Sequence, residues 1–520
     1  MAKATAPWDN IAITSNDSMS DDSMSDNELF LGVDQGSSST KGLLVDATGN
    51  AVQEFAAAVP ARIDNNPCVE QDPEGLLTSV TEVFNRAVAW SNEQGVKIRA
   101  AGLAVQRSGV LAWNSIDGRP RHPVITWADT RTGPIIQNFG RGVERISLKT
   151  GLPTIPNFAA GKIHLLQRQF LEPSIYVATL DAFLLHRMSG KKVFVTEDTM
   201  AARTMLYALT ERGWSNDLCR DFEVDPHRLP RINPSLAPHT HYAGVPIVAL
   251  LGDQQAALIG RSGIKRRPLL NLGTIAALTL DTGCNVVQKT GMMTSVLLSR
   301  LIPNSYAREM KFLIETTSPV TGTVLLEPLR REWCKSSKEL NAMCERAEQE
   351  HLQGRATAYF VNHRHSLPRW EHGVPNVMVS KPDATTADRA RAIVENVGNL
   401  VVRMLEEFSD KGLLGEVLPN EIDVAGGGSE LGYLLQYISD VSGHILHRLA
   451  THEAGSRGAA LCAWMSVNNE FEAHQFNQQE PSRSYRCERP ERRKRYLMWQ
   501  RLEQDTLNGA LPAHAEVEPI

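Results

Sequence analysis

The sequence predicts an α/β protein with two domains of duplicated topology around a central cleft, and three observations support this prediction. At 520 residues the chain is longer than a single hydrophobic core usually serves. Short apolar runs alternate with segments of helical periodicity, which is typical of a largely parallel sheet. An apolar run, a Gly-Ser/Thr turn and a second apolar run occur at Gly36 and again at Gly273. This repetition indicates that the two domains share one plan.

The chain divides into four segments. Residues 1–28 are rich in Ser, Asp, Asn and Met and carry DSMSD twice in tandem, which predicts a disordered acidic tail. Residues 29–265 are assigned to an N-terminal domain and residues 266–466 to a C-terminal domain. Residues 467–520 form a C-terminal extension with a helical segment. Its basic run RPERRKR (489–495) is interpreted as a solvated helix face rather than a nucleic-acid patch.

Individual elements follow from periodicity and turn residues. LFLGVD (29–34) is a strand that ends at the turn GSSST and leads into a second strand, KGLLVD. In the second half, apolar residues recur at helical spacing over 388–408. The strand EIDVAG then runs into Gly426, Gly427 and Gly428, and Ser429 is the expected N-cap of the next helix. Further strands are predicted at 98–105, 124–128 and 245–251.

Composition and charge exclude several classes of protein. Hydrophobic residues make up 42% and charged residues 22%, with a net charge of -5, so we expect a soluble globular protein without a general basic field. Neither nucleic acid nor a membrane is an expected partner. The seven cysteines are scattered and include no C-x-x-C pair, which favours a reducing, cytoplasmic setting. No apolar run approaches the ~18 residues of a membrane span, and no signal-peptide core is visible near the N-terminus.

The turn DQGSSSTKG (34–42) follows a buried strand directly and suits a nucleotide phosphate. Backbone N–H groups and hydroxyls of such a turn can point at phosphate oxygens, and a lysine adds a cation. Asp34 at the strand end suits Mg2+, which prefers oxygen ligands. Taken alone, a Ser-rich hairpin without a ligand is an equally good interpretation. The candidate phosphate-binding residues are Gly36, Ser37, Ser38, Ser39 and Lys41.

Two familiar phosphate loops do not fit this turn. A Walker A loop requires Gly immediately before the Lys, and position 40 is Thr. The Gly-rich turn of a dinucleotide fold opens a helix, whereas a strand is predicted here. The turn is similar to the phosphate hairpin of the actin-like ATPases. NLGT (271–274) is the matching second hairpin, expected to face the nucleotide from the other domain.

Between the two turns, VPIVALLGDQQAALIG (245–260) resembles the FGGY carbohydrate kinases, and among them the glycerol kinases, which share its GDQQAAL. The resemblance implies two actin-like (ribonuclease H-like) ATPase domains and an enzyme that transfers phosphate from ATP, with Mg2+, to a hydroxyl of a small polyol or sugar. Self-association, for example as a homodimer, is common among FGGY kinases and stays open here. Supporting motifs over residues 30–466 come in the family's order: LGVDQGSSSTKG, AVQR (104–107), ITWADTRT (125–132), TGLP (150–153), VTEDTMAARTMLY, NLGT, the triple glycine and EAGSRGAA (453–460).

The resemblance assigns the catalytic base to Asp253. This residue ends a buried strand and precedes a predicted helix, where a carboxylate can be fixed and can accept the proton of an attacking hydroxyl. An isolated Asp in that place would be interpreted as a helix N-cap, and both roles are compatible. With Asp34, Asp253 is also assigned to Mg2+. Gln254 is expected to hydrogen-bond a substrate hydroxyl.

The remaining assignments also follow from the resemblance. Arg107 offers a fork of donors for vicinal hydroxyls, and Trp127 offers a flat wall for C–H faces. Asp129 is a further candidate hydroxyl acceptor, although a structural strand-end Asp is nearly as good an interpretation. The nucleotide side is assigned to residues that are mostly turn glycines and have an equally good structural interpretation: Gly273, Thr274, Gly322, Gly427 and Gly428.

Three departures from the glycerol kinases affect the substrate and the activity. Ser108 stands where they carry an acidic residue, and Asn157 where they carry a substrate-contacting Tyr. Loss of a charge-assisted acceptor leaves more room and favours a larger polyol or ketose. The loop 362–370 keeps only the Pro and Trp of the family's pattern, and its histidines are interpreted as loop residues. The alternative function is therefore a non-catalytic FGGY paralogue that senses a nucleotide or metabolite.

Overall fold

The computed structural model describes most of the chain, and the predicted acidic tail lies outside the described residues except for Glu28, which begins the first strand. None of the described helices is long and apolar enough to cross a membrane. The described residues are 28–138, 142–261, 267–273, 275–289, 291–303, 305, 307–318, 326, 329, 333–352, 358–363, 374–409, 419–449, 453–471, 481–508, 510 and 515–517.

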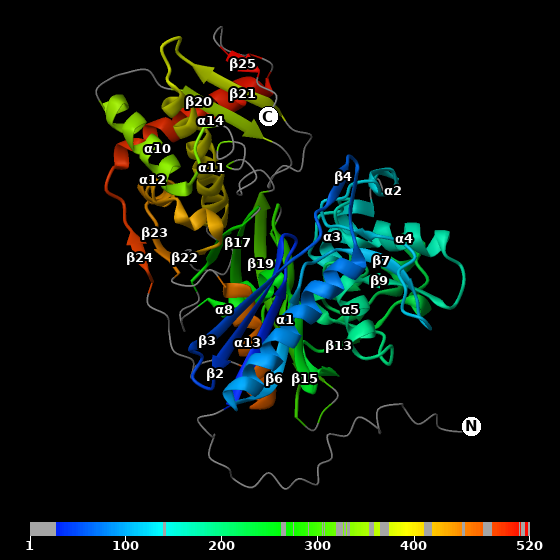
Figure 1. Ribbon diagram of the computed structural model, residues 1–520. Coiled ribbons are helices and arrows are strands. Elements are labelled where there is room, and N and C mark those ends of the chain that lie inside the picture. Colours follow the sequence, from blue (N-terminus) through cyan, green and yellow to red (C-terminus); the bar gives the residue numbers. More distant parts are fainter. Residues whose placement is uncertain are drawn as a thin grey trace, which may run out of the picture.

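Among these residues, thirteen strands form one sheet that runs through both halves of the molecule (Figure 1). Its order is β24-β23-β22-β16-β17-β19-β18-β14-β15-β6-β1-β2-β3. The strands of the first half are β1 (Glu28–Gln35), β2 (Ser39–Asp46), β3 (Ala51–Ala58), β6 (Lys97–Val105), β14 (Leu236–Tyr242) and β15 (Val245–Gly252). Those of the second half are β16 (Leu269–Leu272), β17 (Ala276–Gly283), β18 (Met293–Leu301), β19 (Arg308–Ser318), β22 (Glu421–Ala425), β23 (Ile445–Arg448) and β24 (Arg483–Tyr485).

The two halves repeat one topology. In the first half, β3, β2 and β1 are antiparallel neighbours, and β6 and β15 continue the sheet in parallel. In the second half, β19, β17 and β16 are antiparallel neighbours, and β22 and β23 continue in parallel. The predicted duplication is confirmed. We keep the proposed domain boundary at 265/266, which falls between α8 (Asp253–Gly260) and β16.

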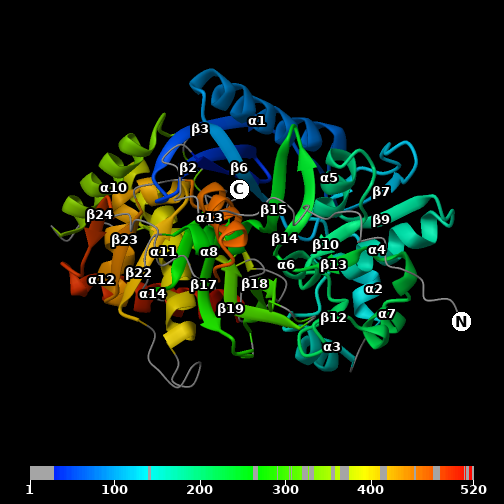
Figure 2. The same ribbon diagram turned by 90° about the horizontal axis from the view of Figure 1, so that it is seen from below.

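Two short helices hold the halves together at the centre of the sheet. Helix α13 (Ala454–Val467) belongs to the second half but packs on β1, β6 and β15 of the first half and against α8 (Figure 2). The approach is close because glycines face it: a Cβ at Gly32 would lie 1.8 Å from the Ser456 carbonyl oxygen, and one at Gly102 would lie 1.9 Å from that of Ala459. Only glycine permits this contact.

Each half has its own hydrophobic core. In the first half, α1 (Pro73–Gln94) is N-capped by Asp72 and packs Leu76, Val80, Val83 and Phe84 into a core shared with β1 and β6. In the second half, α11 (Thr386–Ser409), close to the range predicted for it, is the central helix. The other core helices of the second half are α10 (Ser337–Leu352) and α12 (Gly432–Ser442), beside β20 (Ala358–His363) and β21 (Val374–Ser380).

A smaller layer completes the first half and forms one wall of the cleft. It is built on a five-stranded sheet among the described residues: β4 (Ile63–Asn65), β5 (Cys68–Gln71), β7 (Val110–Asn114), β8 (Val124–Ile125) and β9 (Ile175–Thr179). Around it lie α2 (Gly133–Gln137), α3 (Gly142–Thr150), α4 (Ala159–Gln169), α5 (Leu180–Met188), α6 (Asp198–Ala201), α7 (Asn216–Asp221), η1 (Pro226–Arg228), β10 (Val195–Glu197), β11 (Tyr207–Ala208), β12 (Gly213–Trp214) and β13 (Arg231–Asn233).

Two local predictions are wrong. The strand expected at 124–128 covers only Val124–Ile125, because the chain turns before Trp127. Ser429 does not cap a helix: it lies in the 3-10 turn η2 (Gly427–Glu430) and donates its hydroxyl to the Gly426 carbonyl at 2.7 Å. Helix α12 begins at Gly432, without a side-chain cap.

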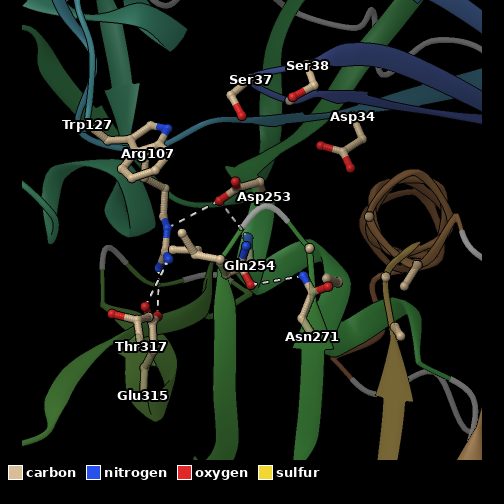
Figure 3. Close-up of a pocket in the computed structure, with 18 of the residues that line it drawn as sticks. Asp34, Ser37, Ser38, Arg107, Trp127, Asp253, Gln254, Asn271, Glu315 and Thr317 are labelled. Carbon is tan, nitrogen blue, oxygen red and sulfur yellow. Dashed lines mark hydrogen bonds and ion pairs between the residues drawn. The ribbon is translucent and has the colours of Figure 1, made fainter. Parts of the chain in front are cut away.

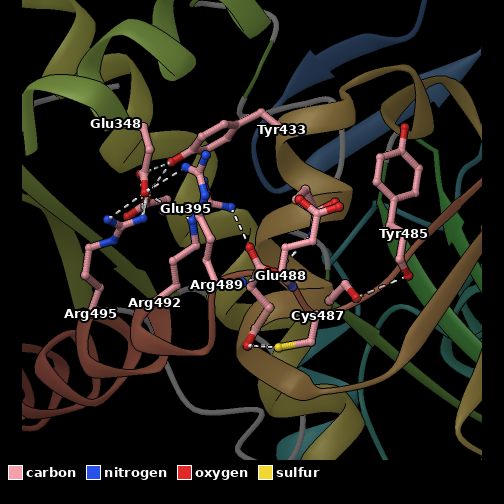
Figure 4. Close-up of polar contacts among 12 residues, drawn as sticks. Glu348, Glu395, Tyr433, Tyr485, Cys487, Glu488, Arg489, Arg492 and Arg495 are labelled. Atoms are coloured by element: carbon pink, nitrogen blue, oxygen red, sulfur yellow. Dashed lines mark hydrogen bonds and ion pairs between the residues drawn. The ribbon is translucent and has the colours of Figure 1, made fainter. Parts of the chain in front are cut away.

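The C-terminal extension packs on the second half. It contains β24, η3 (Pro490–Arg492), α14 (Arg493–Leu507) and β25 (Ala515–Val517); β24 pairs with β23, and β25 with β21. The interpretation of the basic run as a solvated face is wrong for two of its arginines. Arg492 and Arg495 are 4% and 6% exposed. Both contact Glu348 on α10, and Arg495 also reaches Glu395 on α11 (Figure 4). Burial without partners would be costly for these charges, so the carboxylates decide which face turns inward.

Candidate active site

Residues of both halves line a cavity of about 640 Å3 (Figure 3). Gly428 does not line it and is buried beside Leu272, and Thr274 and Gly322 lie outside the described residues. The altered loop at 364–370 is also outside them. Of the residues predicted for the site, the cavity brings together Asp34, Gly36, Ser37, Ser38, Ser39, Lys41, Arg107, Trp127, Asp253, Gln254, Gly273 and Gly427.

The β1–β2 turn reaches the cavity from the first half. The Gly36 N–H donates to the Ser39 carbonyl at 3.0 Å, which closes the turn and leaves Ser37 and Ser38 at the cavity wall. Lys41 on β2 donates to Glu453 Oε1 at 2.8 Å. Because Glu453 immediately precedes α13, this ion pair joins the phosphate turn of one half to the other half.

The second turn, after β16, reaches the same cavity with Gly273. Asn271 on β16 donates its side-chain amide to Gln254 Oε1 at 3.2 Å. Gly426 has a φ of +86° and lies against Leu272, where a Cβ would approach the Leu272 backbone to 2.6 Å. Both the left-handed backbone and the close contact require glycine here. The glycine segment after β22 therefore packs directly against the second turn.

Asp253 is the first residue of α8 and follows β15 directly. The N-cap position is Gly252, so the sequence-based interpretation of Asp253 as an N-cap is wrong, although its Oδ1 accepts the Gln254 N–H at 2.8 Å. The same oxygen lies 3.2 Å from Arg107 Nε. The Gly252 N–H donates to the Thr199 hydroxyl at 2.8 Å, which holds the turn before Asp253. The carboxylate is thus held by two contacts at Oδ1, and the backbone turn before it is held by a third bond.

Arg107, at the end of β6, is held by a buried carboxylate that sequence reasoning missed. Its two Nη groups donate to the two oxygens of Glu315 at 2.9 and 3.0 Å, a bidentate pair. Glu315 lies on β19 and is fully buried. Burial alone would raise the pKa of Glu315, but the Arg107 and Arg203 guanidiniums lower it to about 2. The sequence signal that could have identified Glu315 is that it is the single acid in the largely apolar stretch KFLIET (311–316).

Arg203 is a second residue of the cavity wall that sequence reasoning missed. It lies 3.5 Å from Glu315 and stacks 4.9 Å from the centre of the Phe158 ring. Its Nε is buried and has no hydrogen-bond partner among the described residues. Arg203 therefore retains an unused donor in a residue that lines the cavity. The signal was its place in VTEDTMAARTMLY, a stretch that resembles the FGGY pattern.

The carboxylates on the phosphate side carry raised pKa values. Burial raises the pKa of Asp34 to about 8, with further contributions from Asp253 and Glu453. Burial also raises the pKa of Asp253, against the opposing effect of Arg107. Asp34 Oδ1 is buried without a hydrogen-bond partner in the described part of the chain. An added cation would relieve this accumulation of negative charge.

These residues fit Mg2+ rather than a metal held entirely by protein. Within the described segments no group of three or more His, Cys, Asp or Glu side chains is arranged to hold a metal ion. Mg2+ is usually bound through one or two carboxylates, several waters and substrate phosphates. Asp34 and Asp253 beside two phosphate turns meet that description.

The expectation that Asp129 accepts a substrate hydroxyl is wrong. Asp129 is fully buried and is not among the residues that line the cavity. Its carboxylate accepts the Val69 N–H at 2.6 Å and the Arg131 guanidinium at 2.7 to 3.0 Å. Its acceptor capacity is therefore used within the protein.

Comparison with known proteins places this geometry in context. The chain is 25% identical over 468 residues to a glycerol kinase of Limosilactobacillus reuteri, covering 86% of this chain and 91% of that protein. It is 27% identical over 469 residues to a glycerol kinase of Petrotoga mobilis, covering 85% and 90%. Plasmodium falciparum glycerol kinase with ADP superposes with a TM-score of 0.78 at 21% identity, covering 92% of this chain and 98% of that one. A ligand-bound xylulose kinase of Lactobacillus acidophilus gives 0.73 at 17%, covering 94% and 99%.

The duplicated sheet, with a turn from each half at one cavity, defines the class of fold, the two-domain actin-like ATPase fold. Residues 29–260 match the N-terminal domain, and residues 276–467 the C-terminal domain, of the FGGY family of carbohydrate kinases. The chain belongs to the FGGY family, and it is a kinase that acts on an alcohol acceptor.

Proposed function

We propose that the protein transfers the γ-phosphate of MgATP to a hydroxyl of a small polyol or sugar, with Asp253 as the catalytic base. The observation that carries this proposal is the place of Asp253 in the cavity. Its carboxylate lies 3.2 Å from Arg107 Nε, and the cavity that it lines is also lined by both phosphate turns and by Trp127. An acceptor hydroxyl between Asp253 and the phosphates would lose its proton to a fixed oxygen as it attacks.

The nucleotide side is proposed to use Ser37, Ser38, Ser39 and Lys41 with the opposite turn at Gly273. Thr274 and Gly322 are proposed from the resemblance alone. Bound Mg2+, held by Asp34 and Asp253, would neutralise charge on the phosphates. Because Lys41 already pairs with Glu453, its charge is directed toward the junction of the two halves. Gly426 and Gly427, which line the cavity, are proposed to let the nucleotide approach the backbone.

The acceptor side is proposed to use Arg107, Trp127 and Gln254, joined by Arg203. Two arginines share Glu315 there, and Arg203 is proposed for the acceptor side because it lines the cavity beside Arg107. Asn157 donates its amide to the Trp127 carbonyl at 3.1 Å and fixes the indole wall. The relatives at 25–27% identity are glycerol kinases, but identity at this level leaves the acceptor open. Ser108 leaves room for a chain longer than three carbons.

The test is a coupled ADP-release assay with MgATP and three- to seven-carbon polyols, ketoses and aldonates, glycerol included. We expect ADP release that depends on one class of acceptor. Silence across the panel with ATP still bound would overturn the proposal and support the nucleotide sensor.

The Asp253→Asn variant tests the base directly. We expect turnover to fall about 10²- to 10⁴-fold, the usual contribution of general base catalysis, while the affinity for ATP measured without Mg2+ is kept. Asp117→Asn, on an exposed turn of the same half, is the matched control and should keep wild-type turnover. Full activity of Asp253→Asn would exclude Asp253 as the base.

A further inference from the structure

Lys162 on α4 is a charged residue without exposed surface, and it donates only to backbone carbonyls. Its Nζ lies 3.1 Å from the Ser108 carbonyl oxygen, 2.7 Å from that of Thr126 and 2.7 Å from that of Asn157. A lysine ammonium has three N–H donors, so these three bonds use all of them. Lys162 does not line the cavity.

The three carbonyls belong to three separate segments that form the acceptor side of the cavity. Ser108 follows Arg107 at the end of β6, and both line the cavity. Thr126 precedes Trp127 after β8, and Asn157 lies in the loop before α4; Trp127 and Asn157 also line it. One buried amine therefore connects the three segments that carry Arg107, Trp127 and Asn157.

The backbone at Ser108 gives an independent reason for such a connection. Ser108 has a φ of +62°, in the left-handed region that disfavours residues with a Cβ. A strained residue of this kind persists only where the surroundings hold it. The Lys162 ammonium holds the Ser108 carbonyl, and with it the direction in which Arg107 leaves the strand.

Burying the charged amine of Lys162 costs free energy, so a role that only fills space does not explain why a lysine stands here. Burial lowers the pKa of Lys162 to about 7, with Asp129 opposing this effect and Arg131 adding to it. Asp129 is itself bound by Arg131, so the three carbonyl dipoles are the direct partners of the amine. An apolar side chain would fill the same space without this cost, but it would not hold three loops.

We propose that Lys162 is a positioning residue that sets acceptor affinity and selectivity by holding the Arg107–Ser108, Trp127 and Asn157 segments in register. This inference rests on the proposed function, because it takes these residues as the acceptor wall. It assigns Lys162 no contact with the acceptor and no part in proton transfer. Its loss should therefore affect the acceptor much more than the nucleotide, which binds to segments that Lys162 does not touch.

The experiment compares Lys162→Met, which keeps a long apolar stem without donors, with Lys162→Gln, which keeps two N–H donors. KM for the acceptor and KM for ATP are measured separately with the best acceptor of the wild type. We expect Lys162→Met to raise the acceptor KM about 10- to 100-fold, as misplacement by an ångström can do. Lys162→Gln should raise it less, and the KM for ATP should stay within about twofold in both variants.

Arg228 offers a matched control. It lies outside the cavity and also donates to three backbone carbonyls, those of Gln167 at 3.2 Å, Phe170 at 2.7 Å and Ile175 at 3.3 Å. Arg228→Met removes an equivalent set of bonds at the other end of α4. We expect it to lower the melting temperature without changing the ratio of the two KM values.

The possible results separate the two proposals. A wild-type protein that turns over no acceptor overturns the proposed function. An active wild type in which the Lys162 variants lower the melting temperature but leave the ratio of the two KM values unchanged, as we expect of Arg228→Met, overturns the role of Lys162. If Lys162→Met does not fold, the comparison of Lys162→Gln with the wild type decides, and an unchanged acceptor KM counts against the proposal.

Discussion

At the scale of single residues, identical chemical groups behave differently because of what surrounds them. Asp34 and Glu315 are both carboxylates of the cavity wall. Burial and two neighbouring acids raise the pKa of Asp34 to about 8, whereas Arg107 and Arg203 lower that of Glu315 to about 2. Glu315 is consequently charged at any physiological pH and serves as a fixed anchor. Asp34 is ready to exchange a proton for a cation.

This contrast predicts how Mg2+ binding depends on pH. Because the pKa of Asp34 is raised to about 8, Mg2+ bound at Asp34 as proposed would displace a proton below that pH. We expect the affinity for Mg2+ in the presence of ADP to rise with pH up to about 8 and then to level off. Calorimetric titration in buffers of different ionisation enthalpy should show proton release on binding below that pH.

The effect of Asp34 on stability changes with pH in the opposite direction to that of an ordinary salt-bridged acid. The folded-state pKa of Asp34 is above the usual 3.8, so the folded state binds the extra proton and is favoured by it at low pH. This contribution is lost progressively as the pH rises from about 3.8, where the unfolded chain loses the proton, to about 8, where the folded protein loses it. Asp34→Asn should abolish the proton release, while Asp64→Asn, on the exposed strand β4, should preserve it. Binding of Mg2+ that is independent of pH in the wild type would contradict this account.

At the scale of elements, the C-terminal helix is held by charge as much as by its apolar face. Glu348 on α10 accepts from Arg492 at 3.2 Å, from Arg495 at 2.7 Å and from the Tyr433 hydroxyl at 2.9 Å. Arg492 also reaches Asp440 on α12 at 2.9 Å. The basic run at the start of α14 therefore attaches this helix to α10, α11 and α12.

Removal of one charge from this network should loosen α14. We expect Glu348→Gln to lower the free energy of opening of α14 by about 3–5 kcal/mol, because buried arginines lose their partner. Hydrogen exchange of the α14 amides measures that opening. Glu345→Gln, on the exposed face of the same helix α10, should change it by about 0.5 kcal/mol or less. Equal protection of α14 in both variants would show that the charges do not hold it.

At the scale of the whole molecule, the two halves meet through glycines. Helix α13 packs on Gly32 and Gly102 of the first half. A Cβ added at Gly458 of α13 would lie 1.8 Å from the Ala256 carbonyl oxygen, so this contact also requires glycine. The Lys41 to Glu453 ion pair lies at the start of the same helix. The position of α13 therefore decides both how closely the halves approach and where the phosphate turn lies. The cavity wall depends on this contact.

A single methyl group at this contact should separate the halves. In Gly102→Ala the new Cβ would lie 1.9 Å from the Ala459 backbone oxygen, so β6 and α13 must move apart. We expect a loss of at least about 1–3 kcal/mol in the free energy of unfolding, the usual cost of overpacking. Calorimetry and the KM for ATP should both report the change. Gly133→Ala, where no atom lies within 4 Å of the new Cβ, should leave both unchanged, and equal behaviour of the two variants would refute the glycine contact.

Short stretches of sequence were sufficient to predict the features that local chemistry dictates. Local residues predicted the two turns and the carboxylates Asp34 and Asp253, and the likeness of two such segments predicted the repeated plan of the halves. Family membership confirms the fold and the class of enzyme. The partners of those residues could not be predicted in this way. Glu315 lies 208 positions from Arg107, and Glu453 lies 412 positions from Lys41. Hydrophobic periodicity predicts which face of an element is buried, but not which charged residue of another element lies against that face. Only the folded chain decided that two arginines of a basic run point inward, that Asp129 binds groups of the protein itself, and that Lys162 donates to three separate segments. Each outcome depends on distant groups that must be paired once water is excluded.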